Sequence, residues 1–351
     1  MHRGLSRATR WTAALSVAAA LTACGGAPAT APAPDEAAGD GVLTIYSGRN
    51  EELVGPLIEQ LKAATGATVE VRYGSTGEMA AQLLEEGAES PADLFFAQDA
   101  GALGAVAEAG LLAPLPAEVV EPALETYRAT DSTWVATSAR ARVVVYNTEL
   151  VPEAELPASL DDLLAPRWNG QIGFAPSNAS WLSFVTGLRL LRGEDGARQW
   201  LTAFAAQNPQ SFDGNGAVVD AVAAGTISAG LVNHYYLYEN LAEVDAATYP
   251  VRNHFVANDP LGLVNVAGVG VTAAADDPQL ALDAVSFLLS TDAQQYLVDS
   301  TAEYPVIDGV TPARQDVDLA PLSSLSPPDV ELAELSSLTE TETLLQEVGL
   351  L

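Results

Sequence analysis

The stretch Leu231–Asn240, which reads LVNHYYLYEN, decides how this chain is interpreted. It overlaps the end of a small apolar run, residues 227–232, which predicts a strand. A helix is expected to begin at about Asn233, a residue type suited to the N-cap position. Tyr235 and Tyr236 would then lie in the first turn of that helix, at a strand-to-helix junction. In open α/β sheets this junction is where ligands bind.

The adjacent tyrosines Tyr235 and Tyr236 are compatible with two kinds of site. A phenol binds a metal well only after it loses its proton, and its ordinary pKa of about 10 means that a strongly charged cation must drive this loss. Hard ions choose oxygen donors, which makes ferric iron the obvious candidate. Alternatively, the two rings pack on the sheet or stack on an organic ligand. The pair alone favours this second interpretation, because aromatic residues are usually packing and interface residues.

Strands and helices alternate along the first third of the chain. Short apolar or β-branched runs at 42–48, 68–73 and 91–97 predict strands. Segments with helical spacing follow each of them, at 51–65, at 78–86 and up to about 109. This alternation predicts an α/β fold, with a mostly parallel sheet flanked by helices on both faces.

A long strand is predicted over Trp134–Asn147. Its two-residue period places Arg140 and Arg142 on one face. Because the strand is so apolar beyond Arg142, we interpret it as a crossing between two lobes. The two arginines are interpreted as structural or salt-bridged residues in that crossing, in preference to anion-binding ones.

Two lobes are expected because some three hundred residues exceed one typical core. Further strands are predicted at 170–175 and 263–272, the second returning to the first lobe. Helices are predicted at about 180–191, through Trp200, up to 224, at 279–290 and at 292–300, and an amphipathic segment at 332–348. We place lobe 1 at 41–142 plus 267–315, and lobe 2 at 143–266 plus 316–351.

The N-terminus has the outline of a secretory signal, with three arginines in residues 1–10 followed by an apolar run. The only cysteine, Cys24, comes directly after the small-residue end of this signal, as in bacterial lipoproteins. We therefore expect a lipoprotein signal peptide at 1–23, a lipid on Cys24 and a flexible stalk at 24–40. The alternative is an ordinary signal peptide with a chance cysteine. The mature protein is expected at the outer face of the cell membrane.

Composition and motifs exclude several classes of function. The formal net charge of −31 disfavours nucleic acid or an anionic membrane surface as a partner. A single cysteine excludes an internal disulfide framework and a multi-cysteine metal site. The chain has neither a Gly-x-Ser-x-Gly elbow nor zinc-type histidine spacing, so we do not expect an enzyme.

Seven blocks of sequence occur in an order that resembles the bacterial ferric-ion-binding proteins, the substrate-binding components of iron(III) ABC importers. The resemblance covers essentially everything after the stalk. It implies a two-lobed periplasmic-binding-protein fold of type II, with the ligand in the interlobe cleft. The blocks are 45–52, 91–96, 108–114, 142–146, 168–173, 233–236 and 302–305.

The resemblance also implies metal ligands. Tyr235 and Tyr236 match the paired tyrosinate ligands of the family. Many members have a His where this chain has Asn50 and a Glu where it has Gln98, so amides replace those two side chains. A third tyrosine that other members carry in the loop at 176–180 is absent. Asn50 and Gln98 are open candidates as weak oxygen ligands or as hydrogen-bond donors to iron-bound water. Asp99, next to Gln98, either supplies a carboxylate or caps the following helix.

A synergistic phosphate or carbonate is implied beside the iron. Family members cradle it with small polar residues and backbone N–H groups at a helix start. Two tyrosinates leave Fe³⁺ with one uncancelled positive charge, which such an anion neutralises. Helix capping is the alternative role for Asn178 and Asn215, and His234 and His254 are not assigned to the site. The positions that match the anion site are Asn178, Ala179, Ser180, Asn215 and Asn233.

The expected function is extracytoplasmic binding of ferric iron, bare or chelated, and its delivery to an ABC permease and its ATPase. Lobe closure around the ligand suits a monomer. The alternative is the same fold binding another solute, such as a phosphonate, thiamine, a polyamine or an oxyanion.

Overall fold

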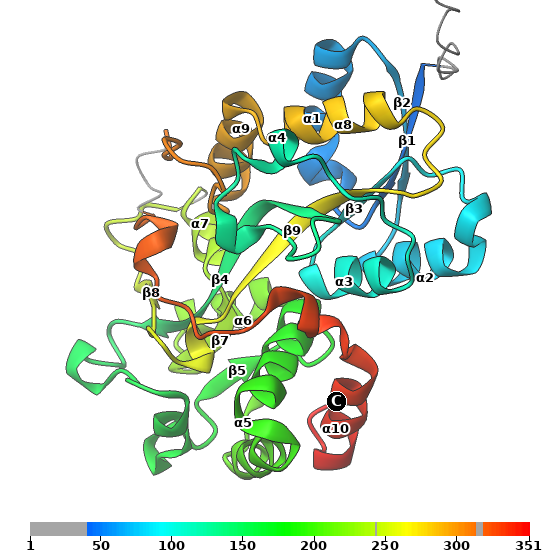
Figure 1. The fold of residues 1–351 in the computed structure, drawn as a ribbon. Coiled ribbons are helices and arrows are strands. Elements are labelled where there is room, and N and C mark those ends of the chain that lie inside the picture. The colour runs from blue at the N-terminus through cyan, green and yellow to red at the C-terminus, as the bar shows by residue number, and fades with distance from the viewer. Residues whose placement is uncertain (1–40, 243, 314–318) are drawn as a thin grey trace, which may run out of the picture. The chain divides into compact units, whose positions relative to one another are not determined.

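The chain folds around one mixed sheet, seen in a computed structural model that describes residues 41–242, 244–313 and 319–351 (Figure 1). Within these ranges the strand order is β2-β1-β3-β9-β4-β7-β5-β6, and β8 pairs with β4. The strands are β1 (Val42–Ser47), β2 (Thr68–Tyr73), β3 (Leu94–Ala97), β4 (Val135–Asn147), β5 (Ile172–Phe174), β6 (Gln210–Ser211), β7 (Ala229–Asn233), β8 (Val251–His254) and β9 (Val264–Val271).

Two parallel groups of strands are joined by antiparallel crossings. β1 pairs in parallel with β2 and β3, and β5 pairs in parallel with β6 and β7. Strand β4 changes partners at its middle, because Ala141 is the last residue paired with β9 and Arg142 is the first paired with β7. This confirms the predicted α/β class and adds that β4 and β9 run antiparallel to their neighbours.

Helices cover both faces of each parallel group (Figure 1). Helices α1 and α8 pack on each other, α2 packs on α3, and α5 and α6 both contact β7. The 3₁₀ helix η8 (Leu332–Ser336) lies against α3 before the chain enters α10, which packs on α5. The helices are α1 (Glu51–Thr65), α2 (Thr76–Glu86), α3 (Ala100–Glu108), α4 (Ala117–Val120), α5 (Ala179–Ala206), α6 (Asn215–Ala223), α7 (Tyr235–Leu241), α8 (Pro278–Leu288), α9 (Thr291–Thr301) and α10 (Leu338–Val348).

The strand pleat sorts the apolar side chains into separate cores. In β7, Leu231 belongs to the core under α5, whereas its neighbour Val232 belongs to the core under α6. Val144 and Val145 in β4 divide in the same way, as expected where alternate residues point to opposite faces. A third core, built on β1, β3 and β9, includes Ala141 and the first half of β4.

The two helices predicted at 180–191 and through Trp200 are present as the two parts of α5, which is interrupted at Gly193 with φ +70° and ψ 167°. Other predicted elements differ in the structure. Strands β6 and β8 and helix α4 were not predicted. Helix α7 begins at Tyr235 with His234 as its N-cap, so the expectation that Asn233 caps it is wrong. Asn233 instead pairs with Arg142 as the last residue of β7.

The predicted signal peptide at 1–23, the lipid site at Cys24 and the stalk at 24–40 lie outside the described residues. Among the helices that the structure describes, none has the length and apolar character needed to cross a membrane.

Candidate metal and anion site

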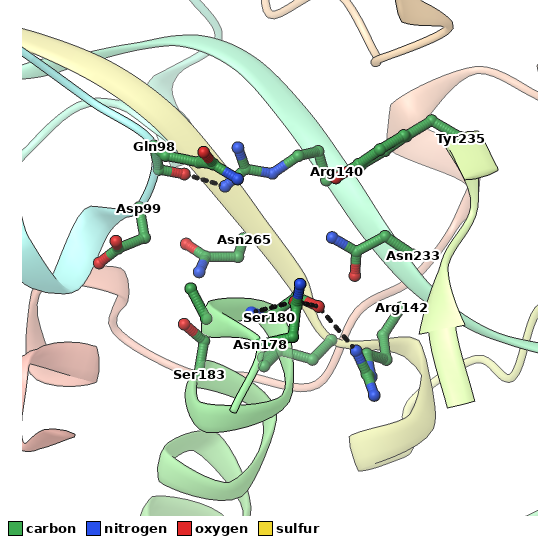
Figure 2. A pocket seen from close by; sticks show the side chains of 12 residues that line it. Gln98, Asp99, Arg140, Arg142, Asn178, Ser180, Ser183, Asn233, Tyr235 and Asn265 are labelled. Carbon is green, nitrogen blue, oxygen red and sulfur yellow. Dashed lines mark hydrogen bonds between the residues drawn. The ribbon is translucent and has the colours of Figure 1, made fainter. Parts of the chain in front are cut away.

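A pocket lies where β4, β7, β9 and the starts of α3 and α5 meet (Figure 2). The strand ends and helix starts bring side chains from distant parts of the sequence to one place. Gln98 and Asp99 come from the β3-to-α3 connection, and Tyr235 comes from the start of α7. The lining residues are Gln98, Asp99, Arg140, Arg142, Asn178, Ala179, Ser180, Ser183, Asn233, Tyr235, Leu263 and Asn265.

The tyrosine pair lies at the junction of β7 and α7, as predicted. The rings of Tyr235 and Tyr236 are 4.4 Å apart between centroids, with their planes at 32°. Tyr235 is 9% exposed and points toward Arg140 (Figure 2). Burial, followed by the neighbouring Tyr236, raises the pKa of Tyr235 well above its ordinary value of about 10. A ligand that needs Tyr235 as a phenolate must therefore supply a strong positive charge.

Two buried guanidiniums, those of Arg140 and Arg142, line the pocket from the same face of β4. Arg142 donates from Nη1 to Ser180 Oγ at 3.1 Å and from Nη2 to the carbonyl oxygen of Leu231 at 2.8 Å. Arg140 donates to the carbonyl oxygen of Gln98. Burial lowers the pKa of Arg142 to about 9, and burial also lowers the pKa of Arg140.

Some donor capacity of the two arginines is unused. Within the described residues, Nε of Arg142 and Nη1 of Arg140 make no hydrogen bond, although Arg140 Nη1 is 3.9 Å from Glu303 Oε1. A buried donor without a partner is costly, and an anion in the pocket offers acceptors of the matching charge.

Small polar groups cluster at the start of α5. Asn178 caps this helix by accepting from the Ser180 N–H at 3.0 Å, so the capping role is present. Asn215, the first residue of α6, donates from Nδ2 to Asn178 Oδ1 and to Ser180 Oγ, both at 3.1 Å. The structure thus brings together the five residues predicted to form an anion site. Asn178, Ala179, Ser180 and Asn233 line the pocket, and Asn215 is hydrogen-bonded to two of them.

The candidates from the first lobe are placed differently from one another. Gln98 and Asp99 line the pocket, and Asp99 also caps α3 by accepting from the Ala102 N–H at 3.0 Å. Burial raises the pKa of Asp99 above its ordinary value. Asn50 is the exposed N-cap residue of α1, makes no capping hydrogen bond through its side chain and is not among the lining residues.

The two described histidines are engaged in internal hydrogen bonds. His234 is buried beside the tyrosine pair, and burial lowers its pKa to about 4. His254 bonds through Nε2 to the carbonyl oxygen of Pro157 at 2.8 Å. Among the described residues, no three His, Cys, Asp or Glu side chains gather as a metal site. Apart from the single carboxylate of Asp99, the side-chain oxygens that line the pocket belong to phenol, amide and hydroxyl groups.

Sequence reasoning did not assign four of the polar lining residues to the site, nor the apolar Leu263. Arg140 and Arg142 were interpreted as structural, and the structure gives them structural bonds and a place in the pocket. Ser183 and Asn265 were not singled out at all. Ser183 lies four residues after Ala179 on the same face of α5, and Asn265 is a lone polar residue in the apolar strand β9. Those two signals were available in the sequence.

The fold and the pocket define a solute-binding protein of the periplasmic-binding class. Residues 89–331 match the family described as bacterial extracellular solute-binding protein, and the chain belongs to this family. The family is extracellular, which agrees with the export inferred from the N-terminus.

Several proteins similar to this chain have names that describe binding of ferric iron. The chain is 33% identical over 317 residues to the Fe(3+)-binding periplasmic protein of Serratia marcescens, covering 90% of this chain and 92% of that protein. The structure of iron-bound HitA from Pseudomonas aeruginosa superposes with a TM-score of 0.79 at 32% identity, over 88% of this chain and 99% of that one. These matches confirm the two-lobed fold class and the resemblance to ferric-ion-binding proteins.

A third similar protein carries an organic anion with its metal. The Trichodesmium protein IdiA (FutA), solved in complex with iron and citrate ligands, superposes with a TM-score of 0.77 at 28% identity, over 88% of this chain and all of that one.

Proposed function

We propose that this protein binds ferric iron through the phenolate oxygens of Tyr235 and Tyr236. The observation that carries the proposal is the pair of adjacent tyrosines at the start of α7, with Tyr235 buried in a pocket that also holds two guanidiniums. The ferric proteins of Serratia and Pseudomonas support it by their similarity over nearly the whole chain. A trivalent ion supplies the charge that a buried phenol needs to ionise.

An anion completes the proposed site. Two phenolates leave one positive charge on Fe³⁺, and Arg142 adds another beside it. A phosphate, carbonate or citrate-like carboxylate would accept from Arg142 and Ser180 while it filled open positions on the metal. The polar cluster at the start of α5 and the citrate in the Trichodesmium protein support this role. The proposed anion residues are Asn178, Ala179, Ser180, Asn215 and Asn233.

Asn50, Gln98 and Asp99 are proposed as further oxygen donors to the metal, less central to the site than the two tyrosines. Gln98 and Asp99 line the same pocket as Tyr235, which supports a role for their amide and carboxylate oxygens toward a bound ion or its water. Asn50 is exposed at the start of α1, and its participation would require the two lobes to close.

The class of solute-binding proteins to which the chain belongs supports a role in delivering iron to a membrane transporter. The proposed lobes are 41–142 plus 267–315 and 143–266 plus 316–351. The separate cores on the two halves of β4 support a division at this strand, while Leu322 and Leu325 pack in the core of its first half. A monomer would close these lobes on iron and present it to an ABC permease and its ATPase, without catalysing a reaction. Lipidation at Cys24 would hold the protein at the outer face of the membrane.

The test is a visible titration of the purified protein with ferric citrate. Wild type should develop a tyrosinate-to-iron charge-transfer band that saturates at about one equivalent, and Tyr235→Phe and Tyr236→Phe should each abolish it. Tyr249→Phe is the matched control, because its hydroxyl accepts from Asn240 of α7 at 2.9 Å but its ring is not part of the Tyr235–Tyr236 pair. That variant should keep the band.

A colourless titration of folded wild-type protein would overturn the ferric proposal. The two guanidiniums in the pocket would then favour an oxyanion as the transported solute, to be tested with phosphate and carbonate by calorimetry.

A further inference from the structure

His234 connects strand β7 to the helix that carries the tyrosine pair, and its side chain is fully buried. Its backbone N–H donates to the carbonyl oxygen of Ala141 at 3.0 Å, and the Ala141 N–H donates back to His234 Nδ1 at 3.2 Å. Because Nδ1 accepts a hydrogen bond, the ring proton is on Nε2. Nε2 lies 2.8 Å from the carbonyl oxygen of Ala302 and donates to it.

The segment that receives this bond is itself firmly held. Tyr304 exchanges two backbone hydrogen bonds of 2.9 Å with Ala139 of β4. Its ring packs on the imidazole of His234 with centroids 4.6 Å apart and planes at 31°. Glu303 binds the guanidinium of Arg49 through both carboxylate oxygens. Ala302 is therefore a fixed acceptor.

Helix α7 depends on such an anchor at its start. It spans seven residues, Tyr235–Leu241, and a helix this short is not stable by itself. His234, its N-cap residue, makes no side-chain capping bond to the helix. The Asn253 side chain, from β8, donates to the His234 carbonyl oxygen at 2.8 Å. The ring of Tyr235 stands edge-on to the imidazole, with centroids 5.8 Å apart and planes at 86°.

We propose that His234 is a positioning residue for the tyrosine pair, which it holds in register with the pocket by tying the start of α7 to both β4 and the segment 302–304. The proposal rests on the proposed ferric function. The bond from Nε2 to Ala302 also joins residues of the two proposed lobes, 143–266 and 267–315. His234 therefore fixes the direction from which the phenols approach the metal, and it touches the metal itself at no stage. Partners that orient a metal ligand commonly change affinity by about 10- to 100-fold when they are removed.

The experiment compares three variants of His234 in the full chain. His234→Phe fills the space but makes neither hydrogen bond. His234→Gln places an amide donor near the position of Nε2, and His234→Asn places an oxygen near Nδ1 but no group that reaches Ala302. His254→Phe is the matched control, since it removes a 2.8 Å bond from a histidine to a backbone carbonyl outside the pocket. The readouts are the wavelength of the charge-transfer band, ferric affinity in competition with citrate, and the melting temperature without iron.

We expect His234→Phe and His234→Asn to weaken ferric binding at least about tenfold and to shift the band, with His234→Gln restoring both most of the way. His254→Phe should lower the melting temperature alone. The proposal is overturned if folded His234→Phe keeps the wild-type band and affinity, or if His254→Phe loses affinity as much. Should His234→Phe fail to fold, equal binding by the Gln and Asn variants would overturn it. A wild-type protein without any band refutes the ferric function first, which separates the two failures.

Discussion

The guanidinium of Arg49 donates to the carboxylate of Glu303 through Nη1 at 3.1 Å and Nη2 at 3.0 Å, and both side chains are buried. Arg140 Nη1 lies 3.9 Å from the same carboxylate, and Arg140 also bonds to the wall of the pocket at Gln98. Burial alone would raise the pKa of Glu303, but Arg49 and then Arg140 hold it below its ordinary value. The loop after β1, the turn after α9 and the pocket are thus linked by one charge cluster.

Replacing Glu303 by Gln should destabilise the protein by about 3–5 kcal/mol, because two buried guanidiniums lose their counter-charge. Urea unfolding at neutral pH measures this difference. The control is Asp161→Asn, which breaks the exposed pair between Arg192 Nη1 and Asp161 Oδ1 at 2.6 Å and should cost no more than about 1 kcal/mol.

The pH dependence of that difference has a definite sign. Since the folded-state pKa of Glu303 is depressed, its stabilising effect is fully present above the ordinary value of 4.5 and is lost as pH falls through the folded-state pKa. The gap between wild type and Glu303→Gln should therefore shrink below about pH 4.5. Equal stabilities at neutral pH would contradict the role given to this cluster.

Local sequence patterns predicted much of this fold and could not predict its long-range pairs. The ranges 51–65 and 68–73 match α1 and β2 residue for residue, because helical periodicity and strand alternation are local properties. The pairing of Arg49 with Glu303 joins residues 254 positions apart and leaves no local signal. Strand β8, with the sequence VRNH, lacks an apolar alternation and is defined by its pairing with β4.

The residues of the candidate site likewise fall into those that the sequence predicted and those that only the structure revealed. The tyrosine pair and the polar residues at the start of α5 were found from residue type, position after a strand and the family resemblance. The contribution of Arg140 and Arg142 needed the structure, because a buried arginine in a crossing strand looks the same in sequence whether it faces a core or a pocket. Side-chain direction in three dimensions decides between these roles.

Gly101→Ala should destabilise the protein by about 1–3 kcal/mol, because a Cβ there would lie 2.4 Å from the backbone oxygen of Leu335. The backbone of η8 would have to move away from α3. Gly77→Ala in α2 is the matched control: a Cβ there meets no atom within 4 Å, and the change should leave stability the same or raise it by up to about 1 kcal/mol. Thermal and urea unfolding compare the two variants. Equal behaviour would mean that η8 does not pack closely on α3 in solution.

Arg142→Lys should keep the charge-transfer band. The increase in band intensity that added phosphate or carbonate causes should, however, be about tenfold smaller than in wild type. The substitution preserves a positive charge and removes the planar fork that reaches Ser180 and Leu231 together. Titrations with and without added anion give the comparison. Arg128→Lys, whose guanidinium donates from Nε to the Ala123 carbonyl oxygen at 2.8 Å outside this pocket, should behave as wild type. Unchanged anion dependence in Arg142→Lys would assign the anion to the start of α5 alone.

Ferric affinity should rise with pH, since the iron-free protein holds Tyr235 as a neutral phenol. Burial, and then Tyr236, raise its pKa well above 10, while Arg140 opposes them. Fe³⁺ must displace the phenol protons, so its apparent affinity should increase by up to about a hundredfold per pH unit if two protons leave. His234 does not add to this slope above about pH 6, because burial lowers its pKa to about 4. The slope is measured by chelator competition between about pH 6 and 8 after subtraction of the chelator's own protonation, and proton release into weak buffer checks the stoichiometry. A flat profile would mean that no phenol ionises, and the tyrosines would then bind their ligand by stacking or hydrogen bonding.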